Sequence, residues 1–316
     1  MLCMIWLLYF FVGVIVLLLS THALIKLTER LSSDLRISPL IIGATVVALG
    51  TSLPELTVSL IASTRHDLGL ALGNIIGSNI VNIFMVLPVG ILIGKLRIGS
   101  TKTQRNALLL LGATTLFIAL QILHLPVLFS GLLLITLALF FTIGEYQLGV
   151  FGRTHEDAKV FRKQTNGKLT FGRVASIMFA IVGVILGGFL VISSVENISI
   201  ITGYSTTILG LSLTAIVTSL PELLTTIFAQ EEHQEKITIG NIIGSNIYNL
   251  LFIGGVITLF SPTITVPFRD WVWLIAATLC FVFILRRFSG KPVPKSIGLL
   301  LLLSLIVYLL SLVYLQ

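Results

Sequence analysis

The chain contains ten apolar runs, each long enough to cross a lipid bilayer as a helix, which takes about 20 residues. They lie near residues 4–25, 37–62, 68–94, 106–123, 127–147, 173–195, 204–229, 237–260, 270–287 and 296–315. Of the 316 residues, 56% are hydrophobic and only 10% are charged, a balance that excludes a soluble globular domain. No Lys or Arg precedes the first run and no clear cleavage motif follows it, so we interpret it as a helix rather than a signal peptide. We predict an all-α, polytopic membrane protein with ten transmembrane helices.

Basic residues gather between alternate runs. When the loops between the runs are numbered along the chain, 18 of the 20 Lys and Arg residues fall in the odd-numbered loops. The two exceptions are Arg65 and Arg269. Because cytoplasmic loops are enriched in Lys and Arg, we place these loops in the cytoplasm and both termini outside a cell membrane, plasma or inner. The net charge of +7 therefore reflects orientation in the lipid bilayer, and we expect no nucleic-acid partner. The long polar stretch at 148–172 is interpreted as a cytoplasmic linker between an N-terminal half, 1–147, and a C-terminal half, 173–316.

Two segments of the chain repeat 167 positions apart. TSLPEL begins at Thr51 and again at Thr218, and GNIIGSN begins at Gly73 and again at Gly240. Each repeat, 39–94 and 206–261, reads as a helix, a turn and a second helix. Five spans separate equivalent points, and an odd number reverses direction, so the copies enter the bilayer from opposite faces. This pattern predicts two inverted five-helix repeats, typical of secondary transporters that bind ions near mid-membrane.

A proline interrupts the same place in both repeats. Pro54 and Pro221 cannot donate a backbone hydrogen bond, so we expect nearby carbonyls to lose their helical partners. Irregular backbone at membrane depth is tolerated only where protein buries it or where it lines a wet cavity. The affected carbonyls, potential cation ligands, are those of 48–51 and 215–218.

A glutamate follows each of these prolines. A charged side chain in mid-bilayer costs roughly 2.5 to 3.5 kcal/mol, and no Lys or Arg lies at comparable depth to neutralise Glu55 or Glu222. If the repeats face each other, the two carboxylates converge and match one divalent cation. Calcium takes 6 to 8 oxygen ligands, which carboxylates, carbonyls and hydroxyls supply. Sodium or protons could occupy the same oxygens.

Small polar residues surround both glutamates in sequence. Thr51 and Ser52 precede Glu55 by four and three residues, which places them near one helix face. On the partner helices, two polar stripes recur every four residues: Asn74, Ser78 and Asn82, and Asn241, Ser245 and Asn249. The G-x-x-x-G spacings at Gly73 and Gly240 alone indicate only close helix contact. Their combination with a polar stripe in both repeats favours a binding site.

Other polar residues indicate less. Five acidic residues at span ends are interpreted as solvated interfacial groups: Asp34, Asp67, Glu145, Glu196 and Asp270. Cys3 and Cys280 have no metal or redox spacing and are interpreted as small buried hydrophobes. The histidines lack i, i+4 pairing, which argues against a zinc site.

The doubled TSLPEL and GNIIGSN motifs closely resemble the alpha repeats of the sodium/calcium exchangers in the calcium:cation antiporter superfamily. Ten spans, outside termini and a cytoplasmic central loop also agree with prokaryotic members. The resemblance implies an antiporter rather than an enzyme, with no catalytic residues, no cofactor, and calcium and sodium as transported ions. It also implies that the first and sixth helices slide across the others to open the site alternately to each side.

The resemblance further implies a set of ion ligands. The central site would be made by Glu55 and Glu222 with the carbonyls of Thr51 and Thr218. The remaining ligands would be Ser52, Ser78, Ser219 and Ser245 with the carbonyls of Ala48 and Ala215 for sodium, and Asn82 and Asn249 at the middle.

Two positions depart from the sodium/calcium exchanger pattern, and two glycines exclude the proton-exchanger pattern. Asn249 stands where many sodium/calcium exchangers carry an aspartate, which leaves ion stoichiometry and proton coupling open. Val217 replaces the glycine that Gly50 provides in the first repeat. Gly77 and its equivalent Gly244 stand where proton/calcium exchangers carry glutamate, which favours sodium as the driving ion.

Two other function classes are weighed against the antiporter. A cation channel also uses broken helices and carboxylates, but usually builds its filter from several subunits, whereas here the symmetry lies within one chain. An intramembrane hydrolase would use Ser52 or Ser219, yet no His or Lys lies within the spans to activate them. We predict a monomeric antiporter that exchanges calcium for sodium by alternating access, with a proton- or potassium-coupled antiporter as the alternative.

Overall fold

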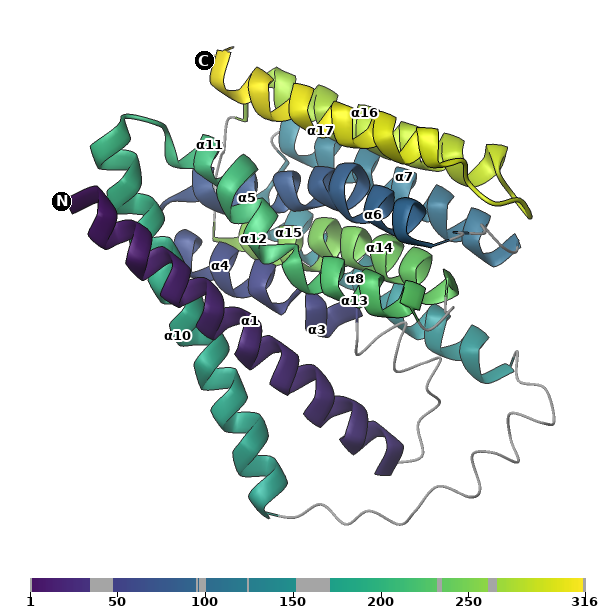
Figure 1. Ribbon diagram of the computed structural model, residues 1–316, viewed down its shortest axis with the longest axis horizontal. Helices are drawn as coiled ribbons and strands as arrows, with labels where there is room; N and C mark the ends of the chain where they lie inside the picture. Colours follow the sequence, from purple (N-terminus) through teal and green to yellow (C-terminus); the bar gives the residue numbers. More distant parts are fainter. Residues whose placement is uncertain are drawn as a thin grey trace.

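The structure is a computed structural model that describes residues 2–34, 48–94, 96, 101–123, 125–151, 171–231, 235–260 and 266–314. Every regular element in these ranges is helical (Figure 1). Six helices are continuous: α1 (Leu2–Asp34), α7 (Thr101–Ile122), α8 (Val127–Phe151), α10 (Phe171–Thr202), α16 (Phe268–Arg287) and α17 (Lys295–Tyr314).

The other helices are broken or contain a π-helical segment, and all belong to the two repeats. In the first repeat they are α3 (Ala48–Thr51), α4 (Leu53–Thr64), α5 (Leu68–Val81), η2 (Asn82–Val86) and α6 (Leu87–Ile93). In the second they are α11 (Thr206–Leu209), η3 (Gly210–Thr214), α12 (Ala215–Thr218), α13 (Leu220–Glu231), α14 (Glu235–Tyr248), η4 (Asn249–Ile253) and α15 (Gly254–Leu259).

The predicted fold class is confirmed. Nine helices in the described ranges are long and apolar enough to cross a membrane, and they coincide with nine of the ten predicted spans. The remaining span, 37–62, falls partly outside the described residues, which resume at Ala48. α1 continues to Asp34, beyond the apolar run at 4–25, because helix-forming residues such as Lys26 and Glu29 extend the helix past the membrane-spanning part. Of the predicted linker, 152–170 lies outside the described residues, while α8 reaches Phe151.

The sequence repeat is also a structural repeat. α4 and α13, α5 and α14, and η2 and η4 begin 167 positions apart. The break residues Ser52 and Ser219 have nearly identical backbone angles, φ −84°, ψ 6° and φ −82°, ψ 4°. Pro54 then lies in the first turn of α4, where a helix needs no N–H donor, so the proline starts a new helix instead of kinking an old one.

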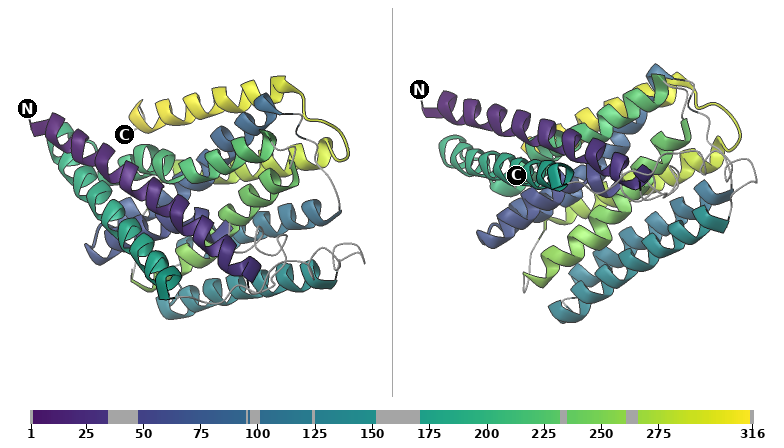
Figure 2. Two further views of the ribbon diagram at one scale, coloured as in Figure 1. Left: turned by 60° about the horizontal axis from the view of Figure 1, so that its bottom comes forward. Right: turned by 90° about the horizontal axis from the view of Figure 1, so that it is seen from below.

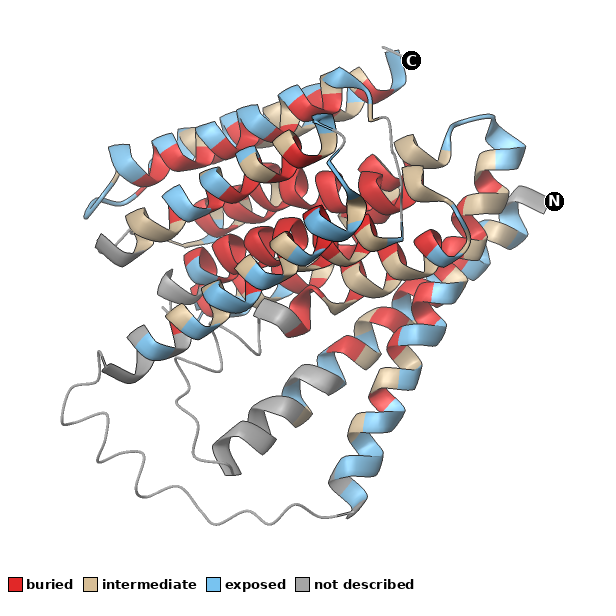
Figure 3. Cartoon of the chain, turned by 180° about the vertical axis from the view of Figure 1, so that it is seen from behind, coloured by how far each residue is buried: buried red, intermediate tan, exposed pale blue. Residues whose placement is uncertain are grey.

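The repeat helices form the centre of the molecule. In the apolar windows of 68–93 and 238–259, 83% of the residues are buried, compared with 22% in the spans formed by α8 and α17. Figure 3 shows buried residues concentrated on the central helices and exposed ones along the outer helices. The exposed side chains on α8, α10 and α17 are mostly large and apolar, as expected of a surface that faces lipid.

α1 and α10 pack as an antiparallel pair on one side of the molecule. A Cβ on Gly13 would lie 2.8 Å from Leu190 Cβ, and one on Gly187 would lie 2.6 Å from the backbone nitrogen of Leu17. As residue numbers rise along α1 they fall along α10, so the helices run in opposite directions. The pair stays together in all three ribbon views (Figures 1 and 2). Glycine thus allows the two backbones to come close.

The interpretation of the span-end acids as solvated groups is wrong for two of them, Glu145 and Asp270. Glu145 and Asp270 are buried, with 5% and 0% of their surface exposed, and they pair with Arg105 and Arg269. Glu196 is partly buried and lies 2.6 Å from Arg65. A carboxylate near the edge of the hydrocarbon is costly, and a neighbouring guanidinium offsets this cost.

Asp67 has a different role at its span end. Its carboxylate caps α5 by accepting the N–H of Leu70, and it also accepts the hydroxyl of Thr206. The capping contact satisfies a helix N–H that lacks a partner within α5. The side chain of Asp34 lies outside the described residues.

The close approach of α1 and α10 predicts that Gly187→Val lowers the unfolding temperature in detergent. The added side chain would overlap backbone atoms of Leu17, at an expected cost of about 1–3 kcal/mol. Gly144→Val in α8 is the matched control, because a Cβ there meets nothing within 4 Å. Equal unfolding temperatures for the two variants in a thermal denaturation assay would contradict the tight α1–α10 contact.

Candidate ion-binding site

Two helix N-termini meet at the centre of the fold, and each carries a glutamate. Glu55 lies in the first turn of α4 and Glu222 in the first turn of α13. Both side chains are completely buried, with 0% exposure. The N-terminal end of a helix carries partial positive charge, so each helix stabilises its own carboxylate. This stabilisation depends on the helix breaks at Ser52 and Ser219, which start α4 and α13 just before the glutamates. The sequence pattern predicted these breaks only as a source of free carbonyls.

The two repeats contact each other crosswise at these glutamates. Ser52, from the first repeat, donates its hydroxyl to Glu222 Oε1 at 3.4 Å. Ser219, from the second, donates to Glu55 Oε1 at the same distance. Each carboxylate is thus held by the serine that lies three residues before the other glutamate. This crossed arrangement brings the two carboxyl groups together from oppositely directed helices.

Each glutamate retains an oxygen with no hydrogen-bond partner. Glu55 Oε2 and Glu222 Oε2 are buried and accept no hydrogen bond. The ion pairs in the described part of the chain belong to other acids, Glu145, Glu196 and Asp270. The two buried carboxyl groups are therefore held by helix ends and hydroxyls, with no basic side chain in contact among the described residues.

The polar stripes of α5 and α14 line the same centre. Ser245 donates to Glu222 Oε1 at 3.1 Å and lies 3.3 Å from the Thr51 hydroxyl. In the equivalent position, Ser78 lies 3.2 Å from the hydroxyl of Thr218. Both threonines also donate to a stripe amide, Thr51 to Asn241 and Thr218 to Asn74. The predicted hydroxyl residues thus come together from four helices.

The two middle asparagines differ. Asn82 donates to Asn246 Oδ1 at 2.9 Å, whereas both amide atoms of buried Asn249 lack a partner. Each begins a π-helical segment, η2 or η4, and such segments often occur at functional sites.

Asn79 and Asn246 were not predicted as part of this network. Asn246 donates to the carbonyl of Asn79, so the last letter of each GNIIGSN motif joins the repeats directly. Its duplication in both motifs was the signal that could have identified the pair.

The carbonyl expectation is only partly met. The carbonyl of Ala215, predicted to be freed by Pro221, accepts the N–H of Ser219 at 3.1 Å and the hydroxyl of Thr218 at 3.4 Å. The helix breaks only after Ser219, so the last turn of α12 keeps the hydrogen bond from the Ser219 N–H to the Ala215 carbonyl. Ala48 begins α3. Both stay predicted sodium ligands.

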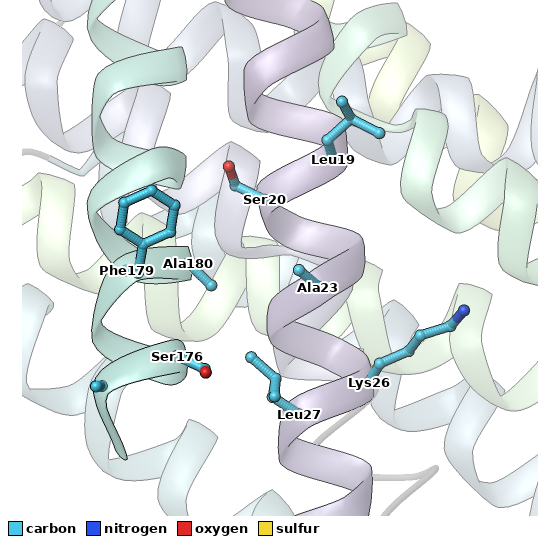
Figure 4. A pocket seen from close by; sticks show the side chains of 9 residues that line it. Leu19, Ser20, Ala23, Lys26, Leu27, Ser176, Phe179 and Ala180 are labelled. Atoms are coloured by element: carbon cyan, nitrogen blue, oxygen red, sulfur yellow. The ribbon is translucent and has the colours of Figure 1, made fainter. Parts of the chain in front are cut away.

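The donor set suits a hard cation. It offers carboxylate, hydroxyl and amide oxygens, the ligands that calcium and sodium prefer. The described residues contain no group of three His, Cys, Asp or Glu side chains that could hold a metal. A separate groove between α1 and α10 is lined mainly by apolar side chains with Lys26 at one end (Figure 4). It includes none of the predicted site residues.

The sequence matches the family model described as "sodium/calcium exchanger protein" over residues 5–146 and 173–314. The chain belongs to the sodium/calcium exchanger family. It is 31% identical to the inner membrane protein YrbG of Escherichia coli K12 and 30% identical to the putative antiporter CaxA of Alkalimonas amylolytica. These alignments cover 96% of both chains for YrbG, and 94% of this chain and 95% of CaxA.

A solved structure of the sodium-calcium exchanger NCX_Mj has a closely similar fold. The TM-score is 0.68 at 25% identity, and the match covers 99% of each chain. The fold of NCX_Mj therefore extends over nearly the whole chain and includes both repeats and the outer helices. The protein is an integral, multi-pass membrane protein.

The asparagine contacts between the repeats of this exchanger-family chain predict a stability effect. Asn246→Leu keeps the side-chain size but removes the hydrogen bonds to Asn82 Nδ2 and to the carbonyl of Asn79, at an expected cost of about 1–2 kcal/mol. Asn197→Leu is the control, because Asn197 bonds only to a carbonyl of its own helix. Chemical unfolding in detergent measures both. An Asn246→Leu variant as stable as Asn197→Leu would show that the contact carries no stability.

Proposed function

We propose that the protein is a secondary active antiporter that exchanges calcium for sodium across the cell membrane. The observation that carries the proposal is the pair of fully buried glutamates, Glu55 and Glu222, each with one unpartnered carboxylate oxygen and no basic neighbour among the described residues. Family membership supports a cation antiporter. A transported cation is the natural counter-charge, because it must leave again, whereas a permanent salt bridge would remain.

The predicted ligands fall into two groups, one for calcium and one for sodium. Glu55 and Glu222, with the carbonyls of Thr51 and Thr218 and the amides of Asn82 and Asn249, would surround calcium. The sodium ions would take the hydroxyls of Ser52, Ser78, Ser219 and Ser245 with the carbonyls of Ala48 and Ala215. Asn249 fits this role because both its amide atoms are buried without a partner. Two carboxylates cannot fully neutralise calcium and several sodium ions together, so the ions compete for one site.

Alternating access supplies the transport step. The α1–α10 pair is held together by close glycine contacts and would move as a unit across the central helices. The sodium gradient and membrane potential drive the cycle, and each elementary charge moved is worth about 2.3 kcal/mol per 100 mV. Because the whole site comes from one chain, a monomer suffices. The basic-residue pattern supports outside termini.

A channel fits these observations less well. A conducting pore needs a continuous wet path, whereas Glu55 and Glu222 have 0% exposure and Asn82 and Asn249 are equally buried. An exchanger needs a state in which the site is closed to both sides.

Neutralising either glutamate is expected to abolish exchange. In proteoliposomes loaded with sodium, Glu55→Gln or Glu222→Gln should reduce calcium-45 uptake at least about 100-fold, because each removes half of the charge that binds a divalent ion. Glu231→Gln, an exposed residue at the end of α13, is the control and should transport normally. Uptake at the control rate in both single variants would refute the assignment of the site.

The driving ion is tested separately. Calcium uptake into vesicles should require internal sodium and should not be supported by internal potassium or by a pH gradient alone. Gly77 and Gly244 stand in place of the glutamates found in proton exchangers, which is the reason to expect sodium. Uptake driven equally by potassium or by protons would replace sodium with that ion and leave the antiporter class intact.

A further inference from the structure

Arg65 is a basic residue that orientation in the membrane does not explain. It is one of two Lys or Arg residues outside the odd-numbered loops, and the other, Arg269, pairs with its neighbour Asp270. Arg65 lies at the end of α4, in the turn that leads to α5, and reaches a different helix, α10. The residue 167 positions later is Glu232, so the second repeat has no basic residue at the equivalent place. The contact of Arg65 therefore belongs to one repeat only and needs its own explanation.

The guanidinium of Arg65 makes three contacts with α10. Its Nη1 donates to Glu196 Oε2 at 2.6 Å, and its Nη2 donates to Ser193 Oγ at 3.2 Å. The guanidinium carbon lies 4.5 Å from the centre of the Phe189 ring, within reach of a cation–π interaction. The three partners are spaced four and three residues apart, so they share one face of α10. We name this set, Arg65 with Phe189, Ser193 and Glu196, the Arg65 clamp.

The backbone of Arg65 is anchored to the central helices. Its N–H donates to the carbonyl of Ala62 at 3.1 Å, and the N–H of Asp67 donates to the same carbonyl at 2.9 Å. Between them, His66 has φ 61°, a left-handed conformation that a residue other than glycine keeps only where its surroundings hold it. The Asp67 side chain caps α5 and accepts the hydroxyl of Thr206 in α11. The clamp therefore extends from a fixed turn to α10.

α4 and α10 otherwise meet through small and apolar groups. Thr57, Ile61 and Arg65 are spaced four residues apart and so lie on one face of α4. A Cβ on Gly188 would lie 2.7 Å from the Thr57 methyl group and 3.5 Å from Ile61 Cδ1. Apolar contacts are non-directional, so they hold two helices together without fixing their relative position along the axis. Among the described residues, the side-chain hydrogen bonds that join α1 or α10 to α4 are those of Arg65.

The clamp lies at one end of this contact. Residue numbers rise together, from 57 to 65 on α4 and from 188 to 196 on α10, so the two helices run parallel. Glu55 lies on the same helix as Arg65, ten residues earlier. A planar guanidinium fixes both the distance and the direction of its partners. The clamp therefore also sets where α10 lies beside the helix that carries Glu55.

We propose that Arg65 is a positioning residue that fixes the place of the α1–α10 pair along α4. While the clamp is closed, the pair keeps the position seen here, and movement along α4 requires the guanidinium to leave its three partners. The ion pair is only partly buried, with 26% and 29% of the two side chains exposed, so its modest strength suits a contact that opens and closes. The proposal rests on the proposed function for its effect on exchange and not for the contact itself.

Disulfide formation between α4 and α10 tests the clamp. In a background with Cys3 and Cys280 replaced by serine, Thr57→Cys and Gly188→Cys place two Cβ atoms 3.5 Å apart, which is within the range of a disulfide. The rate of thiol loss under a mild oxidant in lipid vesicles then measures how often α10 holds the present position. We expect Arg65→Glu to slow this reaction about threefold or more, because two like charges replace the ion pair.

An exchange of charges separates the ion pair from a general loss of structure. Glu196→Arg should slow the reaction as Arg65→Glu does, and the double variant should recover at least about half of the parent rate, because the exchanged pair restores the attraction. Arg286→Glu, an exposed residue in the last turn of α16, is the control for a change of charge and should react at the parent rate. A second cysteine pair, Ser20→Cys with Gly183→Cys, joins α1 to α10, where the two Cβ atoms would lie 2.9 Å apart. Its rate should not change with Arg65→Glu, since these two helices stay together.

Equal rates in the parent and both single variants would overturn the proposal, and so would a double variant as slow as the single ones. On the proposed function, the oxidised Thr57→Cys/Gly188→Cys variant should lose calcium-for-sodium exchange until a reductant is added, whereas the oxidised Ser20→Cys/Gly183→Cys variant should keep it. If the wild type shows no such exchange yet the disulfide rates follow the charges, the proposed ions are wrong and the clamp stands. If exchange is present and the rates do not follow the charges, only the clamp is wrong.

Discussion

Two carboxyl groups buried at the centre of a membrane protein are the constraint on which the rest of the structure depends. Glu55 and Glu222 are fully buried, and the described residues provide no basic side chain in contact with either. Charges in such a place must be held by helix ends, dipolar groups or an ion. Each of the other special features, the broken helices, the duplicated serines and the polar stripes, supplies one of these. Three acids near span ends, Glu145, Glu196 and Asp270, pair with arginine instead, which distinguishes them from the two glutamates of the candidate site.

The four-residue turn Ser-Leu-Pro-Glu solves this problem with few residues. Proline in the first turn of α4 ends the preceding helix without losing a hydrogen bond that α4 needs. The glutamate then falls in the first turn, where the helix dipole favours negative charge. Ser52, just before the helix, is left free to reach the carboxylate of the other repeat. Duplication and inversion of one such turn produce the crossed contacts with no further sequence change.

Much of this could be predicted from the sequence, because the strongest signals are local or repeated. Length and apolarity place the spans, and the 167-residue repeat pairs Glu55 with Glu222. Contacts between distant residues were harder. The pairs Arg105–Glu145 and Arg65–Glu196 join residues that spacing alone does not relate, and the π-helical start at Asn82 has no composition signal. Whether the Ala215 carbonyl keeps its hydrogen bond depends on where the helix breaks within one turn. The position of the proline does not specify this.

Although their motifs are almost identical, the two repeats do not make identical contacts. Asn82 bonds to Asn246, while the equivalent Asn249 has no partner. Ser245 contacts both Thr51 and Glu222, whereas the contact of Ser78 is with Thr218. Since the side chains at these positions are the same in both halves, exchanging the two contact sets gives a second arrangement of similar energy. Inverted repeats alternate between two such arrangements, each opening toward a different face. On the proposed function, the near-identity of the motifs would keep the two states close in energy, a balance that a site releasing its ion to either side requires.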